Sequence, residues 1–239
     1  MQIPTAQPGG TGVDDLDHSF QPLSLADRAY RRIEAMILSG KLQAGQRLKD
    51  AMLADTFSIS RGPVRSALAR LAEAGLVDLI PYRGAFVRTI DFDDVLEIYD
   101  VRAAVERAGV IAACRRMTPD VLAELGQHVD AMSLHFKAGD TEAYFKSNLA
   151  FHALIHKTSG NSRLRDLYER YTREQKLFRH FSLATVGIDE SNKQHRRIMR
   201  ALKAGDGDAA GREMENHVLS AKRRLAQAVD KIRQDYPTV

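Results

Sequence analysis

Residues 59–75 read ISRGPVRSALARLAEAG, and this stretch decides the fold of the first third of the chain. Its apolar residues recur at i, i+3, i+4 and i+7, which places them on one face of a helix. They are Val64, Ala67, Leu68 and Leu71. Pro63 fits the first turn, where a missing backbone N–H does little harm, and Ser60 is the expected N-cap. We therefore predict an amphipathic helix whose other face is left outside the core.

The segments around this helix complete a small domain. Helical pattern also runs from Ser24 to the stop at Gly40 and again over 50–57, with 42–48 as a short connection. Downstream, the strand-like runs 76–80 and 85–88 flank a turn that contains Pro and Gly. Three helices followed by a β-hairpin wing predict an N-terminal winged helix-turn-helix domain over residues 24–90.

The outward face of the third helix has the chemistry of a nucleic-acid reader. Its members are Arg61, Gly62, Arg65, Ser66 and Ala69. An Arg can donate two hydrogen bonds to guanine in the major groove, and small neighbours allow close approach. Arg83, at the hairpin tip, could reach phosphate or the minor groove. The alternative is an ordinary solvated helix face, which the helix alone leaves open.

The distribution of charge is consistent with DNA binding. Residues 25–90 carry eleven Lys or Arg against six Asp or Glu, whereas residues 1–24 carry three Asp and no base. A compact basic segment is expected of a module that neutralises phosphates. A solvated basic surface would give the same count.

Four motifs in this region closely resemble the GntR-type winged-helix domain. They are LKDAMLA at 48–54, ISRGPVRSAL at 59–68, LAEAGLV at 71–77 and GAFV at 84–87. The resemblance implies that Arg61, Arg65 and Ser66 contact an operator, with Arg70, Arg83 and Gly84 assisting. Ala51 stands where some relatives have another DNA-contacting Arg, and Lys49 could replace it by contacting phosphate.

From residue 91 onward the pattern is entirely helical. Six amphipathic helices are predicted, over 92–116, 118–138, 140–159, 162–183, 186–204 and 207–233. The fold class is therefore mainly α, with an all-α six-helix bundle over 91–233. Residues 1–23, rich in Gly, Pro, Gln and Asp, and residues 234–239 are expected to be tails.

Three histidines in the bundle form a candidate metal site. Asn148 and His152 are four residues apart and share a helix face, and His195 and His217 lie among apolar neighbours on the two last helices. Converging histidines with an oxygen donor would suit Zn²⁺, Ni²⁺ or Mn²⁺. Each histidine taken alone could equally be a packed or solvated side chain.

The bundle resembles the FCD ligand-binding domain of the FadR subfamily, in its six-helix, VanR-like form. The matching segments are VRAAVE at 101–106, NLAFH at 148–152, SGN at 159–161, HRRI at 195–198, AGD at 204–206 and MENH at 214–217. The resemblance implies that Asn148, His152, His195 and His217 are metal ligands. The family usually has Asp at the position of Asn148, and a neutral amide is the weaker ligand. His156 is expected beside the cavity or at the surface.

The same resemblance implies an effector site at Arg102. An arginine there commonly faces the cavity and holds a carboxylate. Tyr99, Tyr144 and Phe145 are candidate wall residues of that cavity. Arg102 also precedes Glu106 by four residues, so an ordinary i,i+4 ion pair is the alternative. We expect the effector to be a small organic acid.

Composition excludes several classes of protein. The chain of 239 residues is 44% hydrophobic and 28% charged, with a single Cys, so a disulfide framework is ruled out. No apolar run approaches the ~18 residues that span a bilayer, and the N-terminus lacks signal-peptide features. These features favour a cytoplasmic protein without a membrane partner.

Two other functions are alternatives to a ligand-responsive transcription regulator. HALIH at 152–156 has the histidine spacing of a zinc hydrolase but lacks its Glu. An architectural DNA-binding protein would need no sensing bundle. We therefore predict a regulator rather than an enzyme. As a homodimer it would bind a pseudo-palindromic double-stranded operator, and the resemblance implies a repressor released by its effector.

Overall fold

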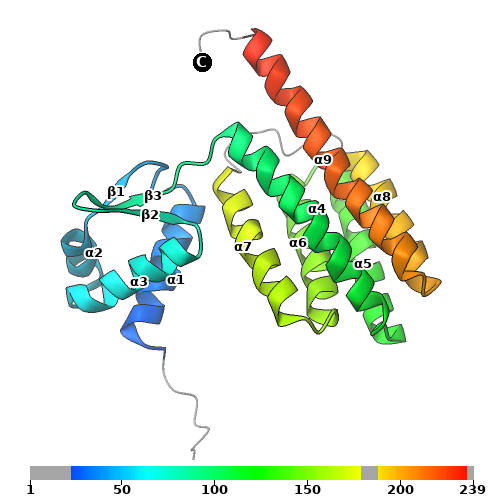
Figure 1. Cartoon of the computed structure of the whole chain (residues 1–239), viewed down its shortest axis with the longest axis horizontal. Coiled ribbons are helices and arrows are strands. Elements are labelled where there is room, and N and C mark those ends of the chain that lie inside the picture. The colour runs from blue at the N-terminus through cyan, green and yellow to red at the C-terminus, as the bar shows by residue number, and fades with distance from the viewer. Residues whose placement is uncertain (1–22, 179–187, 236–239) are drawn as a thin grey trace, which may run out of the picture.

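The computed structural model describes residues 23–178 and 188–235, and these form two units that lie side by side (Figure 1). The N-terminal unit comprises α1 (Leu25–Leu38), β1 (Arg47–Leu48), α2 (Asp50–Phe57), α3 (Arg61–Glu73), β2 (Val77–Ile80) and β3 (Gly84–Val87). The helical unit comprises α4 (Phe92–Cys114), α5 (Pro119–Lys137), α6 (Thr141–Thr158), α7 (Ser162–Phe178), α8 (Ile188–Lys203) and α9 (Gly207–Asp235). The mainly α fold class predicted from the sequence is confirmed. The predicted tails lie almost wholly outside the described residues, as do parts of the helices expected over 162–183 and 186–204.

The N-terminal unit is held together by the apolar faces of α1 and α3. Ile33 on α1 and Val64 and Leu71 on α3 are fully buried, as the stripe predicts. Ser24 caps α1, because its hydroxyl accepts a hydrogen bond from the backbone N–H of Asp27 at 3.1 Å. Ser60 stands at the N-cap of α3 as predicted, although its side chain makes no capping hydrogen bond.

The wing is a three-stranded antiparallel sheet in the order β1-β3-β2. The hairpin register pairs Val77 with Val87 and Ile80 with Gly84. The sequence predicted these two strands but placed 42–48 in a plain connection. In the structure Arg47 pairs with Phe86 and Leu48 with Ala85, so this connection supplies a third, edge strand.

The helical unit is built around α4, which packs against α9, α7 and α6. A capping box starts α4, in which the Asp91 carboxylate accepts from the N–H of Asp94 and the Asp94 carboxylate accepts from the N–H of Asp91. Thr118 caps α5, and Pro119 occupies its first turn. The core contains fully buried Phe151 and Met214.

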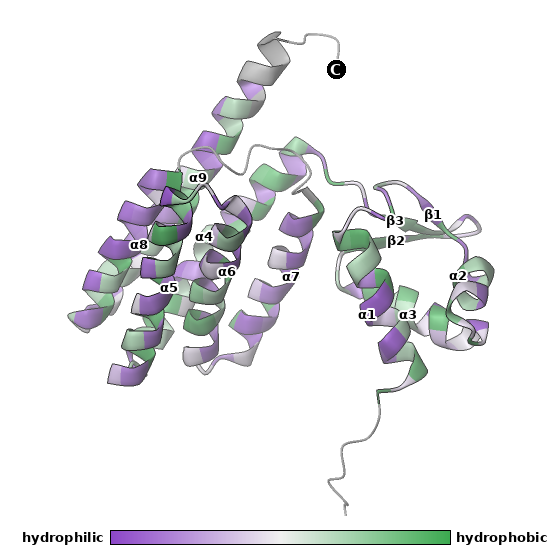
Figure 2. Ribbon diagram, turned by 180° about the vertical axis from the view of Figure 1, so that it is seen from behind, coloured by the Kyte–Doolittle hydropathy of each residue, from purple (hydrophilic) through white to green (hydrophobic). Residues whose placement is uncertain are grey.

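Helices of both units carry hydrophilic and hydrophobic residues in alternation along their length, as expected where only one side is buried (Figure 2). No helix in the described part of the chain combines the length and apolar character that a membrane crossing requires.

Candidate nucleic-acid interface and metal centre

The outward face of α3 is exposed as the sequence predicts. Arg61, Arg65 and Ser66 are all exposed, while Val64 and Ala67 between them are fully buried. Arg65 is oriented by α2, because its Nε donates to the Asp50 carboxylate at 2.6 Å. This hydrogen bond lowers the pKa of the Asp50 carboxyl. The face thus presents two guanidinium groups, one of them already positioned.

Other residues expected to assist lie around this face. Lys49 is exposed at the N-cap position of α2. Arg70 instead contacts α1, where it donates to Asp27 at 2.6 Å and lies over the Tyr30 ring at 4.9 Å. Sequence reasoning did not anticipate that α1 holds this arginine, because Asp27 is 43 residues away along the chain.

The wing tip projects an aromatic and a basic side chain. Tyr82 is fully exposed with φ of +60°, and Gly84 has φ of +102°. Both values lie in the left-handed region, which glycine adopts without strain, and this explains the residue type at position 84. Arg83 lies 5.7 Å from the centre of the Phe86 ring. The tip therefore has an exposed cationic group carried on a tight turn.

In the helical unit, three buried histidines converge from three helices. His152 on α6, His195 on α8 and His217 on α9 form the histidine cluster, and one ring nitrogen of each lies within 4.8 Å of the others. The ring centres of His195 and His217 are 4.4 Å apart. The convergence that the sequence could not show is present in the structure.

The tautomers of two of these rings are set by neighbouring side chains. His152 donates from Nδ1 to the Glu106 carboxylate at 2.8 Å, and His217 donates from Nδ1 to Gln194 at 3.0 Å. In that arrangement Nε2 of each ring carries a lone pair. Burial lowers the pKa of all three histidines and so favours the neutral form, the state in which imidazole binds a metal.

Several ring nitrogens of the histidine cluster have no partner among the described residues. They are Nε2 of His152 and both nitrogens of His195. A buried polar atom without a partner costs free energy, so a group that satisfies them would stabilise the site. The donor set fits a divalent metal of the Zn²⁺ or Ni²⁺ type. Asn148 is half-buried one turn before His152 on α6.

Glu106 connects the histidine cluster to Arg102. It is fully buried, accepts from Arg102 Nε at 3.1 Å and lies 3.5 Å from His156 Nε2. Burial opposes its charge, but His152, His156 and Arg102 together hold the pKa of its carboxyl well below the usual value. The sequence indicated only the i,i+4 pair with Arg102, because the contacts with α6 depend on the tertiary fold.

Arg102 is nearly buried and contacts an aromatic ring, a carboxylate and a side-chain amide. Its guanidinium lies 5.5 Å from the centre of the Tyr99 ring, and its Nη1 donates to Oε1 of Gln175 on α7 at 3.5 Å. Burial alone would lower its pKa, but the Glu106 charge raises it. The i,i+4 ion pair with Glu106 is therefore confirmed as a contact, and it engages the guanidinium through Nε.

His156 lies outside the histidine cluster. The alternative of a surface position was wrong, since the ring is buried and stacks on Tyr168 at 4.4 Å between centres. A Cβ at Gly109 would approach its ring to 2.5 Å, so only glycine on α4 leaves room for it. His156 is thus packed beside the site.

α7 contacts both units. Its Tyr168 and Tyr171 pack with Val105 of α4, close to Arg102 and Glu106. On the other side, Leu177 packs against the core of the N-terminal unit. Glu174 lies over Gly75, where a Cβ would come within 2.4 Å of its carboxylate, and 3.9 Å from Arg88. Helix α7 therefore contacts both the surroundings of Arg102 in the helical unit and the core of the N-terminal unit.

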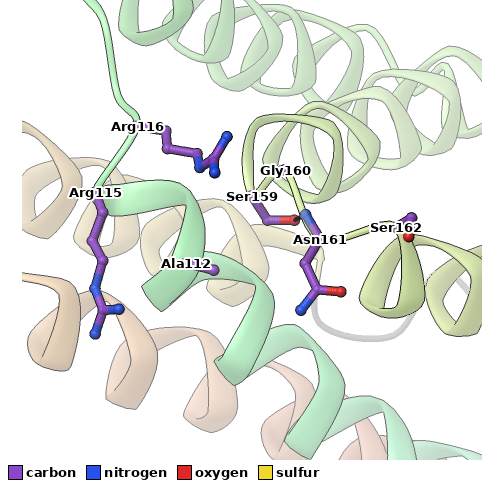
Figure 3. A pocket seen from close by; sticks show the side chains of 7 residues that line it. All are labelled: Ala112, Arg115, Arg116, Ser159, Gly160, Asn161 and Ser162. Carbon is purple, nitrogen blue, oxygen red and sulfur yellow. Dashed lines mark hydrogen bonds between the residues drawn. The ribbon is translucent and has the colours of Figure 1, made fainter. Parts of the chain in front are cut away.

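A separate surface pocket of about 460 Å³ lies where α4 and α6 end and α7 begins (Figure 3). Its lining includes Arg115, Arg116 and the Ser159-Gly160-Asn161 turn. No residue that the sequence predicts for DNA, metal or effector binding lines it.

Comparisons with known proteins match both units. The family model for bacterial regulatory proteins of the gntR family matches residues 25–87, and the FCD domain model matches residues 97–220. The chain is 27% identical to the HTH-type transcriptional repressor RspR of Escherichia coli K12, over 90% of this chain and 92% of RspR. It is also 27% identical to the HTH-type transcriptional repressor GlaR of the same organism, over 84% of this chain and 95% of GlaR.

Solved structures share the fold. E. coli McbR/YncC superposes with a TM-score of 0.67 at 24% identity, over 90% of this chain and all of that one. The FCD match alone covers half of the chain, and the motif resemblance seen in the sequence agrees with both matches. The chain therefore belongs to the GntR family of bacterial DNA-binding transcription regulators, in the FadR-like branch that carries an FCD domain, a family of regulators rather than enzymes.

Proposed function

We propose that this protein is a ligand-responsive repressor that binds DNA as a homodimer and is released by a small organic acid. The observation that carries the DNA-binding part is the exposed face of α3, with Arg61, Arg65 and Ser66 above a buried core. Two-fold symmetry would place two such helices on a pseudo-palindromic operator. The names of RspR and GlaR as repressors support the sign of regulation. We place its action in the cytoplasm, where bacterial DNA lies.

The domain assignment and contact residues follow from the same proposal. Residues 24–90 would read DNA and residues 91–233 would sense the effector. Arg61 and Arg65 would contact bases, and Ser66 would lie close to the groove floor. Lys49, Arg83 and Gly84 would contact the backbone or minor groove. Arg70 would contribute only by leaving its ion pair with Asp27.

A divalent metal would be held by His152, His195 and His217, with Asn148 as the oxygen donor. The convergence of the three rings supports this assignment. Glu106 and Gln194 would fix the ring orientations from behind. When bound, the metal would supply a Lewis acid that attracts a carboxylate oxygen.

Arg102 and Tyr99 would hold the effector beside this metal. The guanidinium is rigid and pairs well with a carboxylate. Its contact with Gln175 suggests how binding is transmitted, because Gln175 and Glu174 are neighbours on α7. Effector binding would shift α7 and, with it, the contacts at Gly75 and Arg88. The effector must favour one of the two arrangements, since equal affinity would shift nothing.

The DNA-binding part is tested by selecting sites from random duplex DNA with purified protein. We expect a short inverted repeat. Arg65→Ala should weaken binding to that repeat by about 10-fold or more. Arg200→Ala, an exposed arginine on α8, is the matched control and should leave binding unchanged. Recovery of no repeat, with or without added acids and Zn²⁺, would contradict the proposal.

The metal is tested by stripping the protein with a chelator and titrating Zn²⁺ or Ni²⁺. We expect one ion per chain and a higher melting temperature, since a ligand that binds only the folded state stabilises it. His195→Ala should lose the ion, whereas His128→Ala, on α5 and outside the histidine cluster, should keep it. Equal binding by both variants would contradict the assignment.

A further inference from the structure

Arg224 lies on the same face of α9 as His217. The two residues are seven positions apart, which corresponds to two helical turns or about 10 Å along the axis. Arg224 is half-buried, and it donates to the Ser191 hydroxyl at 2.9 Å. Ser191 precedes His195 by one turn on α8. Arg224 is therefore placed further along the same column of polar side chains as the histidine cluster.

Two buried polar atoms at this place have no partner among the described residues. They are Nε of Arg224 and the hydroxyl of Tyr144. Tyr144 comes from α6, one turn before Asn148, and is 2% exposed. Burial lowers the pKa of Arg224 and raises that of Tyr144 to about 12. Unsatisfied buried donors are costly, and an acid group could accept from both.

Arg224 also differs from Arg102 in its charge balance. Arg102 has Glu106 as a buried counter-charge at 3.1 Å. Within the part of the chain that the structure describes, Arg224 has no carboxylate at ion-pair distance, and the nearby Glu190 lies 3.8 Å from Arg197. The centre of the Tyr99 ring is 5.5 Å from the Arg102 guanidinium, and Tyr99 also lies within electrostatic range of Arg224.

We propose that Arg224 is a second anchor for the effector and that the effector is a diacid. One carboxylate would bind at Arg102 and the histidine cluster, and the other would lie between Arg224 and Tyr144. The charge count favours this class of ligand. Arg102 and Glu106 cancel, the histidines and Asn148 are neutral, and a divalent metal with Arg224 leaves an excess positive charge that a dianion neutralises better than a monoanion. This inference rests on the proposed sensing function.

The test uses the full-length, Zn²⁺-loaded protein and isothermal titration. Butanedioate and pentanedioate are compared with butanoate and pentanoate at neutral pH. We expect the wild type to bind a diacid at least about 10-fold more tightly than the monoacid of the same length. Arg224→Gln should weaken diacid binding by about 10- to 100-fold and change monoacid binding little, since only the second carboxylate loses its partner.

Two further variants separate binding from folding. Arg223→Gln is the matched control, because Arg223 is exposed on α9 and donates a hydrogen bond to Ser220, one turn before it on the same helix. It should change neither affinity. Arg224→Lys keeps the charge without the planar fork and should lie between wild type and Arg224→Gln.

The inference is overturned if the wild type does not prefer diacids, if it binds none of the four acids, or if Arg224→Gln weakens both classes equally. None of these results depends on DNA. Site selection with the same preparations therefore tests the proposed function separately.

Discussion

Replacing Glu106 with Gln should strongly destabilise the helical unit. The Glu106 carboxylate is fully buried and is the only counter-charge within ion-pair distance of Arg102 among the described residues. Gln keeps a similar shape and one oxygen acceptor but removes the negative charge. Breaking a buried ion pair from one side typically costs about 3–5 kcal/mol, because the other charge stays buried and uncompensated. The retained acceptor places our expectation near the lower end, at about 3 kcal/mol.

The free energy of unfolding can be measured for the metal-free protein by circular dichroism in urea. The matched control is Glu215→Gln on α9. Its carboxylate pairs with Arg107 of α4 at 2.6 Å, but both side chains are substantially exposed. A surface pair of this kind contributes at most about 1 kcal/mol. Glu106→Gln should therefore lower the midpoint clearly more than Glu215→Gln does.

A double-mutant cycle checks the cause. If the loss arises from the stranded Arg102 charge, Arg102→Met together with Glu106→Gln should cost less than the two single changes added together. Equal costs for Glu106→Gln and Glu215→Gln would refute the reasoning. So would simple additivity in the cycle, since it would mean that the two buried charges do not depend on each other.

Three further predictions follow from other parts of the structure. Gly75→Ala should lower the free energy of unfolding by about 1–2 kcal/mol in the same urea assay, because Gly75 has φ of +77° and faces Glu174. The control Gly126→Ala in α5, where nothing crowds a Cβ, should be neutral or stabilising. The metal-free protein should become less stable as the pH falls below about 6.5, because burial lowers the pKa of the cluster histidines in the folded state, so the unfolded chain binds more protons. The free energy of unfolding should fall by up to about 1.4 kcal/mol per pH unit for each histidine of the cluster. Urea midpoints that stay constant over this pH range would contradict the prediction. Asn148→Asp should tighten Zn²⁺ binding by about 10-fold or more in competition with a chromophoric chelator, since a carboxylate replaces a neutral donor, and an unchanged affinity would place residue 148 outside the metal site.

The N-terminal unit could be predicted from the sequence because its elements are specified locally. The spacing of Val64, Leu68 and Leu71 defines one buried face of α3 and thereby the exposed face that carries Arg61 and Arg65. The edge strand at Arg47–Leu48 could not be predicted in this way. Two residues are too few to show alternation, and their strand conformation depends on pairing with β3.

The buried centre of the helical unit could be predicted only in part. The resemblance to the FCD domain predicted that His152, His195 and His217 bind one metal. In the structure their ring nitrogens do lie close to one another. The role of Glu106 as a link to His152 and His156 was missed, because it depends on how α4 packs against α6. The only sequence signal was a glutamate on a strongly apolar stretch of helix.

The position of α7 limits how the proposed effector could act on DNA binding. Its Gln175 contacts Arg102. The adjacent Glu174 packs over Gly75 and lies 3.2 Å from Arg170 of α7 itself and 3.9 Å from Arg88, so the two ends of the proposed pathway are neighbouring residues on one helix. A carboxylate that takes the Arg102 donor from Gln175 would remove one of the contacts that fix α7. Glu174 packs over Gly75 of the N-terminal unit, so we expect a displacement of α7 to change this contact between the two units. Coupling through the contact of α7 with Gly75 and Arg88 would require no change within the winged helix itself, only a change in its position relative to the helical unit.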